Sequence, residues 1–285
     1  MPTTAVTGAT GHLGRLVVAS LRAQGADVVA LVRDPAKAAE VLGRDVETRV
    51  ASYDDRAALE AALAGVDVLV LVSGSEVGQR VRQHTTVVEA ARAAGVARVV
   101  YTSAPHADTT PLVLAPEHKA TEEVIVGSGL AFTILRNNWY HENYADQVSQ
   151  AAESGVLLGS AHGGRTASAA RQDYAEAAAA VALGAGHDDR VYELAGDVAW
   201  TRPELAAAIT EVTGSPVEYR DLSTDEHVAA LTAAGLDEAT AGFVAALDAN
   251  TAEGTLADTS TGDLRRLIGR PTTPLVDGLR AATAA

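Results

Sequence analysis

A doubly wound parallel α/β sheet is the fold class that the sequence predicts, and two observations carry that prediction. Short apolar runs rich in β-branched residues alternate with amphipathic stretches of helical length through the first half of the chain. Two of those runs, 28–32 and 68–72, are apolar at every position, which is typical of strands buried on both faces. After about residue 145 the alternation loosens, so we expect a smaller, partly interleaved C-terminal α+β domain there.

Each stretch of the first half has a place in this alternation. We expect strands at 4–7, 28–32, 46–51, 68–72, 99–102 and 132–136, and helices at 13–24, 35–42, 55–64, 80–94 and 117–127. Later in the chain we expect a helix at 173–183 and strands at 191–195 and 216–221. We therefore predict a nucleotide-binding domain at 1–150, which the strand at 191–195 rejoins, and a second domain at 151–285.

The residues at the helix ends agree with this assignment. Asp34 precedes Pro35, which is an N-cap followed by proline at the first helical position. Gly65, Gly95 and Gly129 each stand between a predicted helix and the next strand, where a C-terminal glycine cap is common.

A glycine-rich turn, Thr7-Gly-Ala-Thr-Gly-His-Leu-Gly14, follows the first strand and opens the first helix. This is the context in which a dinucleotide pyrophosphate sits on a helix N-terminus. Its spacing is Gly-x-x-Gly-x-x-Gly, and any β–α turn rich in glycine can imitate it. The motif therefore predicts a dinucleotide without specifying which one.

Ligands of a doubly wound sheet bind beyond the carboxyl ends of its strands. The residues at those ends are Gly8, Arg33, Ser73, Gly74, Ser75, Thr102, Ser103, Asn137 and Asn138. Arg33 follows the second strand, where an arginine binds the 2′-phosphate of NADP and a carboxylate binds the ribose of NAD. Asp34 is next to it, but its place before a proline favours capping. With Lys37 as a second cation, we expect NADP(H).

Four side chains are candidates for contact with the substrate or the cofactor. The side-chain amide of Asn137 can both donate to and accept from a carboxamide, and the rings of Trp139 and Tyr140 can flank a planar molecule. A hydrophobic patch that joins the two domains is the alternative for these aromatic residues. His118, on the helix before the sixth strand, is a candidate general acid or ribose contact, with an ordinary helix histidine as the alternative.

Composition argues against several classes of function. The chain has 285 residues and a net charge of −15, which disfavours nucleic acid and anionic membranes as partners. It contains no cysteine, so disulfides, thiolate metal sites and cysteine nucleophiles are excluded, and we assign no metal. We find neither a signal-peptide pattern nor a membrane-spanning apolar run, and we expect a cytoplasmic protein.

Several blocks of sequence together carry a family resemblance. They are the glycine turn, Val32-Arg-Asp-Pro-Ala-Lys37, Ser75-Glu-Val-Gly-Gln-Arg80, Tyr101-Thr-Ser103, His106-Ala-Asp108 and Leu135-Arg-Asn-Asn-Trp-Tyr-His-Glu-Asn-Tyr144. In these blocks, and over nearly its whole length, the chain resembles the NmrA-like atypical short-chain dehydrogenases, most of all their quinone-reducing branch. Ordinary short-chain dehydrogenases use a Tyr-x-x-x-Lys pair, but none of the seven tyrosines here has a lysine four residues later.

The resemblance implies direct two-electron hydride transfer from NADPH to a quinone, without flavin. It implies cofactor contacts by Gly8, Ala9, Thr10, Gly11, His12, Leu13, Arg33, Ser73, Gly74, Ser75 and Asn137. Tyr140, Asn137 and His118 are the candidates for a hydrogen-bond donor to the quinone oxygen. An NADP-sensing regulatory protein without catalysis, and a reductase of dyes or other conjugated electrophiles, are the alternatives. Both a monomer and a homodimer are compatible with the sequence.

The chain departs from the family pattern at three positions. Ser52 stands where an aspartate is expected near the adenine, and Gly74 and Asn138 stand where serine and glycine are expected.

Overall fold

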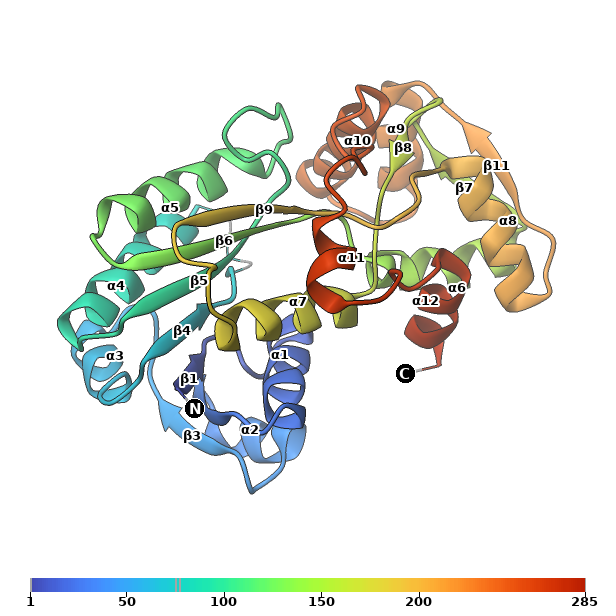
Figure 1. Cartoon of the computed structure of the whole chain (residues 1–285). Coiled ribbons are helices and arrows are strands. Elements are labelled where there is room, and N and C mark those ends of the chain that lie inside the picture. Colours follow the sequence, from blue (N-terminus) through green and yellow to red (C-terminus); the bar gives the residue numbers. More distant parts are fainter. Residues whose placement is uncertain (1, 75, 77, 285) are drawn as a thin grey trace.

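Strands from the first half of the chain and one later strand form a seven-stranded parallel sheet (Figure 1). The computed structural model describes residues 2–74, 76 and 78–284. The strands of the sheet are β1 (Thr3–Val6), β2 (Asp27–Val32), β3 (Glu47–Val50), β4 (Val68–Leu71), β5 (Arg98–Ser103), β6 (Ala131–Asn137) and β9 (Arg190–Leu194). Their order, β3-β2-β1-β4-β5-β6-β9, confirms the predicted doubly wound sheet.

Helices cover both faces of this sheet (Figure 1). They are α1 (His12–Ala23), α2 (Pro35–Leu42), α3 (Arg56–Ala62), α4 (Arg80–Ala93), α5 (Ala115–Gly127) and α7 (Arg171–Leu183). In β4, Val68 and Val70 pack with α1 and α7, whereas Leu69 and Leu71 pack with α3 and α4. This two-sided burial explains why the strand is apolar at every position. In the described part of the chain, no helix is long and apolar enough to cross a membrane.

A smaller lobe lies beside the sheet and has a core of its own (Figure 1). Its elements are η1 (His141–Tyr144), α6 (Ala145–Ser154), β7 (Val156–Gly159), β8 (Arg165–Thr166), β10 (Trp200–Thr201), α8 (Arg202–Thr213), β11 (Glu218–Asp221), α9 (Thr224–Ala233), α10 (Glu238–Ala252) and α12 (Leu275–Thr283). Helix α11 (Asp263–Ile268) instead packs against α7 and β9, with Leu264 in the core of the sheet. Strands β7 and β11 pair in parallel, and β8 and β10 pair antiparallel. Trp200, Leu205 and Ile209 are buried in the core of this lobe.

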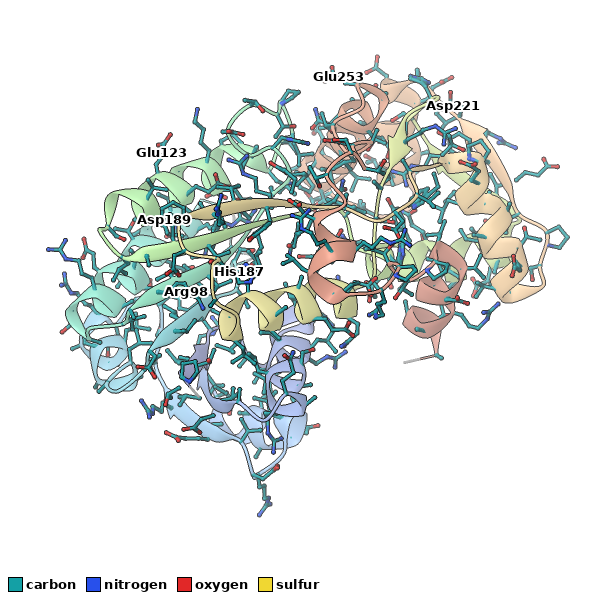
Figure 2. The ribbon with its side chains drawn as sticks, viewed as in Figure 1. Arg98, Glu123, His187, Asp189, Asp221 and Glu253 are labelled. Atoms are coloured by element: carbon teal, nitrogen blue, oxygen red, sulfur yellow. The ribbon has the colours of Figure 1, made fainter. Side chains whose placement is uncertain are left out.

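The chain passes between the two parts more than once. Helix α7 packs against α1, and β9 pairs with β6, although α7 and β9 both come after residue 150. At the amino end of β5, Arg98 holds this return in place: it donates to the Ala182 carbonyl at 2.8 Å and to Asp188 at 3.1 Å. His187 lies beside Arg98 (Figure 2). The division of the chain near residue 150 stays a prediction.

The predicted helix ends take the expected form. The Asp34 carboxylate accepts from the backbone N–H groups of Ala36 at 2.9 Å and Lys37 at 3.2 Å, so its capping role is confirmed. Gly65 and Gly95 have φ angles of +74° and +79°, in the left-handed region that favours glycine after a helix.

Candidate functional site

A cavity of about 500 Å³ opens at the carboxyl ends of β1, β2, β3 and β4. Strand β1 pairs with β2 on one side and β4 on the other, so the sheet reverses its winding here. The volume falls in the range of roughly 300–1,000 Å³ that is typical of small-molecule and cofactor sites. The cavity therefore lies at the strand ends where the sequence predicted that a ligand would bind.

The glycine turn forms the floor of the cavity. Gly8 has a φ of +57°, and its carbonyl oxygen accepts from the Gly11 N–H at 2.8 Å. A Cβ on Gly14 would lie 2.2 Å from the Gly8 oxygen, so only glycine lets α1 approach the turn. The N-cap residue of α1, Gly11, has no side chain that could cap the helix, and the first turn of α1 holds no acidic residue. These features suit a phosphate at the start of the helix.

Two cations lie at the end of the cavity formed by β2. Arg33 is 78% exposed at its side chain and forms an ion pair with Glu76 at 3.4 Å. Lys37, from the first turn of α2, also lines the cavity. Because the Asp34 carboxylate is occupied by backbone N–H groups, this end of the cavity suits a 2′-phosphate.

The ends of β3 and β4 form the middle of the cavity. Ser73 and Gly74 line it, whereas Ser75 lies outside the described residues. The nearest atom to a Cβ built on Gly74 is 3.6 Å away, so the expected serine would fit there. Ser52 lines the cavity too, and its hydroxyl accepts from the Asp54 N–H at 3.3 Å.

Tyr140 lines the cavity beyond the end of β6. Its hydroxyl oxygen accepts from Asn137 Nδ2 at 3.3 Å, and the Arg171 guanidinium lies 5.1 Å from the centre of its ring. Burial raises the pKa of Tyr140, so the phenol keeps its proton at neutral pH. Asn137 is buried, and its Oδ1 has no hydrogen-bond partner among the described residues.

Among the predicted site residues that the structure describes, His118, Ala9 and Asn137 do not line the cavity, although Asn137 contacts the lining residue Tyr140. His118 is 7% exposed, and its Nδ1 lies 2.8 Å from the Tyr101 hydroxyl. Burial, together with the nearby charge of Arg80, lowers the pKa of His118 to about 3. Ala9 is fully buried in the core beneath the turn. Thus Tyr140 and Asn137 come together, and His118 lies apart from them.

Four polar lining residues were not singled out from the sequence: Tyr53, Asp54, Gln83 and Arg171. Tyr53 follows β3 and was detectable by the same carboxyl-end rule that found Arg33. Arg171 begins α7 and reaches the cavity only because that helix returns to pack against α1. Asn138, found in place of the expected glycine, donates to the Leu256 carbonyl at 3.2 Å and so connects β6 to the smaller lobe.

The residues of this cavity fit a dinucleotide along its whole length. The close approach at Gly14, the two cations by β2 and the Tyr140 hydroxyl each match a different part of such a cofactor. The comparisons with known proteins agree. The NAD(P)H-binding family matches residues 8–183, from the glycine turn to the end of α7.

Relatives cover nearly the whole chain. Quinone oxidoreductase 2 of Escherichia coli (strain K12) is 48% identical over 277 residues, which is 96% of each protein. The crystal structure of the E. coli NADPH-dependent quinone oxidoreductase complexed with NADPH superposes with a TM-score of 0.93 and 48% identity, covering 98% of this chain and 99% of that one.

Two further relatives come from other branches. The Citrobacter sp. triphenylmethane reductase complexed with NADP(H) has a TM-score of 0.92 and 35% identity, covering 98% of this chain and 99% of its own. An NmrA-like family domain-containing oxidoreductase of Aspergillus flavus is 33% identical over 78% of this chain and 75% of its own. The chain therefore belongs to the NAD(P)H-binding family and, within it, to the NmrA-like oxidoreductases.

Proposed function

We propose that this protein reduces quinones with NADPH by direct two-electron hydride transfer, without flavin. The observation that carries the proposal is the 48% identity to the E. coli quinone oxidoreductase over 96% of the chain. Because this similarity spans both the sheet and the smaller lobe, it includes the Tyr140 end of the cavity as well as the glycine turn.

The cofactor would lie along the cavity from Arg33 to Tyr140. The turn from Gly8 to Gly14 would hold its pyrophosphate, and Arg33 with Lys37 would hold the 2′-phosphate that distinguishes NADPH from NADH. When bound, NADPH supplies the hydride. The protein contributes placement of the two reactants and stabilisation of the charge that develops on the substrate.

Tyr140 is the side chain best placed to stabilise that charge. Its oxygen accepts from Asn137 Nδ2, so its own O–H is left to donate toward the cavity. The raised pKa keeps this proton in place at neutral pH, and the Arg171 guanidinium adds positive potential above the ring. Tyr140 would therefore donate a hydrogen bond to the quinone oxygen while Asn137 orients the phenol, and water would supply the final proton.

Reduction of triphenylmethane dyes is a second candidate. It is supported by the likeness to the Citrobacter reductase, which covers 98% of this chain at 35% identity. Dyes of this class are conjugated electrophiles and would need the same placement beside the cofactor.

The oxidation of NADPH, followed by its absorbance, tests both candidates in one assay. The acceptors are a simple benzoquinone, a naphthoquinone and a triphenylmethane dye, and NADH replaces NADPH in a parallel series. The proposal predicts turnover with the quinones and a preference for NADPH. Tight NADPH binding without turnover of any quinone would contradict it and would favour an NADP-sensing protein.

A further inference from the structure

One helix, α4, provides hydrogen-bond partners for both the N–H and the carbonyl of Gly74, a residue in the middle of the cavity. The Gly74 N–H donates to His84 Nε2 at 3.0 Å, and the Gly74 carbonyl accepts from Arg80 Nε at 2.9 Å. His84 is fully buried and Arg80 is 5% exposed. The two side chains lie one turn apart on α4, so they reach the same peptide from the same face of the helix.

The hydrogen bonds around His84 fix its tautomer. Because Nε2 accepts from Gly74, the ring proton must be on Nδ1, which lies 3.2 Å from the Thr121 hydroxyl oxygen. The Thr121 hydroxyl donates onward to the Glu117 carbonyl at 2.9 Å, so its oxygen is free to accept from the ring. Burial and the nearby charge of Arg80 lower the pKa of His84 to about 3, which keeps the ring neutral.

The charge of Arg80 is also balanced within this arrangement. Arg80 Nη1 lies 2.8 Å from a carboxylate oxygen of Glu117, on α5. The other oxygen of that carboxylate accepts from the Gly78 N–H at 2.8 Å. Helices α4 and α5 thus hold peptide groups at two points of the segment that follows β4.

Side-chain hydroxyls also accept hydrogen bonds from the backbone N–H groups of the two residues that precede Gly74. The Val72 N–H donates to Thr7 Oγ1 at 3.1 Å, and the Ser73 N–H donates to Thr102 Oγ1 at 2.9 Å. With the Gly74 N–H on His84, three successive backbone donors are occupied by protein atoms. A ligand over residues 72–74 therefore finds no free backbone N–H there, whereas the Ser73 hydroxyl can both donate and accept, which suits the hydroxyl groups of a ribose or the N–H of a carboxamide.

We propose that His84 is a positioning residue, which fixes the Gly74 peptide so that the segment after β4 receives the ribose and nicotinamide of NADPH. The proposal rests on the NADPH part of the proposed function and does not depend on the choice of substrate. The ring does not line the cavity. It acts through one accepted hydrogen bond, so a side chain that restores an acceptor at the same place should restore binding.

Two variants separate the hydrogen bond from the volume of the ring. His84→Phe keeps a ring and removes the acceptor, whereas His84→Gln offers its amide oxygen to the Gly74 N–H. The dissociation constant of NADPH is measured by fluorescence titration without quinone, with hydrogen–deuterium exchange of the peptide containing Gly74 and thermal denaturation of each variant. His227→Phe is the control, because it removes a buried, hydrogen-bonded histidine of the smaller lobe, 3.0 Å from Ser160.

We expect His84→Phe to weaken NADPH binding by about tenfold and to speed exchange at Gly74, because it leaves a buried N–H without a partner. His84→Gln should bind within about threefold of the parent protein, and His227→Phe should lose thermal stability without a change in NADPH affinity. Unchanged affinity in His84→Phe, or equal losses in the Phe and Gln variants, would overturn the proposal.

A second pair of variants keeps the test decisive if His84→Phe does not fold. Thr121→Val removes the oxygen that faces His84 Nδ1, and Thr121→Ser retains it. We expect weaker NADPH binding in the Val variant alone; equal binding in both would overturn the proposal. Because NADPH binding is measured without quinone, a parent protein that binds NADPH and turns over no quinone would refute the proposed function and leave this inference standing.

Discussion

Replacement of Arg33 by alanine should separate the two nicotinamide cofactors. The side chain is 78% exposed, and its partner Glu76 is 52% exposed at 3.4 Å, so the ion pair itself adds little to stability. The thermal midpoint should therefore stay close to that of the parent protein. What the variant loses is a charge-assisted contact with the 2′-phosphate, a loss of about 1.5–3 kcal/mol. That range corresponds to an NADPH dissociation constant raised by about 12-fold to 140-fold.

The assay is a fluorescence titration of parent and variant with NADPH and with NADH. NADH has no 2′-phosphate, so its affinity should change by less than about twofold. Arg22→Ala is the matched control, because Arg22 is a partly exposed arginine paired with Asp45 at the far end of α1, and its loss changes the net charge equally. An equal weakening of both cofactors in Arg33→Ala would refute the assignment of this residue to the 2′-phosphate.

Three further substitutions test other parts of the structure. Gly14→Ala places a Cβ 2.2 Å from a backbone oxygen of the turn, against 3.1 Å for Gly11→Ala, so NADPH titration should show a loss of at least about tenfold for the first and a smaller loss for the second. Tyr140→Phe keeps the ring and removes the donor, so kcat for quinone should fall about tenfold to a hundredfold while NADPH affinity is retained; an unchanged kcat would exclude the donor role. Arg136→Met leaves the buried Glu122 without its 2.7 Å partner, and urea denaturation should show about 3–5 kcal/mol less stability; a smaller loss would show that the ion pair is dispensable.

The elements of the sheet could be predicted from the sequence because their signals are local. The run from Val68 to Val72 is apolar at each position because both faces of β4 are covered, and Asp34 with Pro35 marks the start of α2 by its own hydrogen bonds. The carboxyl-end rule located Arg33, Ser73 and Gly8 at the cavity, since parallel strands of one sheet bring those ends to the same edge.

The rest of the cavity depends on packing between distant segments, which a periodic pattern does not encode. Arg171 lines the cavity because α7 returns to α1 across more than a hundred residues of chain, and Gln83 does so because α4 begins beside the turn after β4. His118 shows the opposite case. Its place on α5 suggested a role near the substrate, but its ring lies against Tyr101 in a buried cluster.

The measurement that tests the central claim most directly is the transfer of the hydride itself. Protein free of flavin is loaded with NADPH that carries deuterium at the transferring position of the nicotinamide, and is mixed with a simple quinone in a stopped-flow instrument without oxygen. The proposed function predicts one hydroquinone formed for each NADPH oxidised, deuterium-slowed oxidation, and no requirement for added flavin. Bound NADPH that is not oxidised by quinone, or oxidation that begins only when flavin is added, would contradict it.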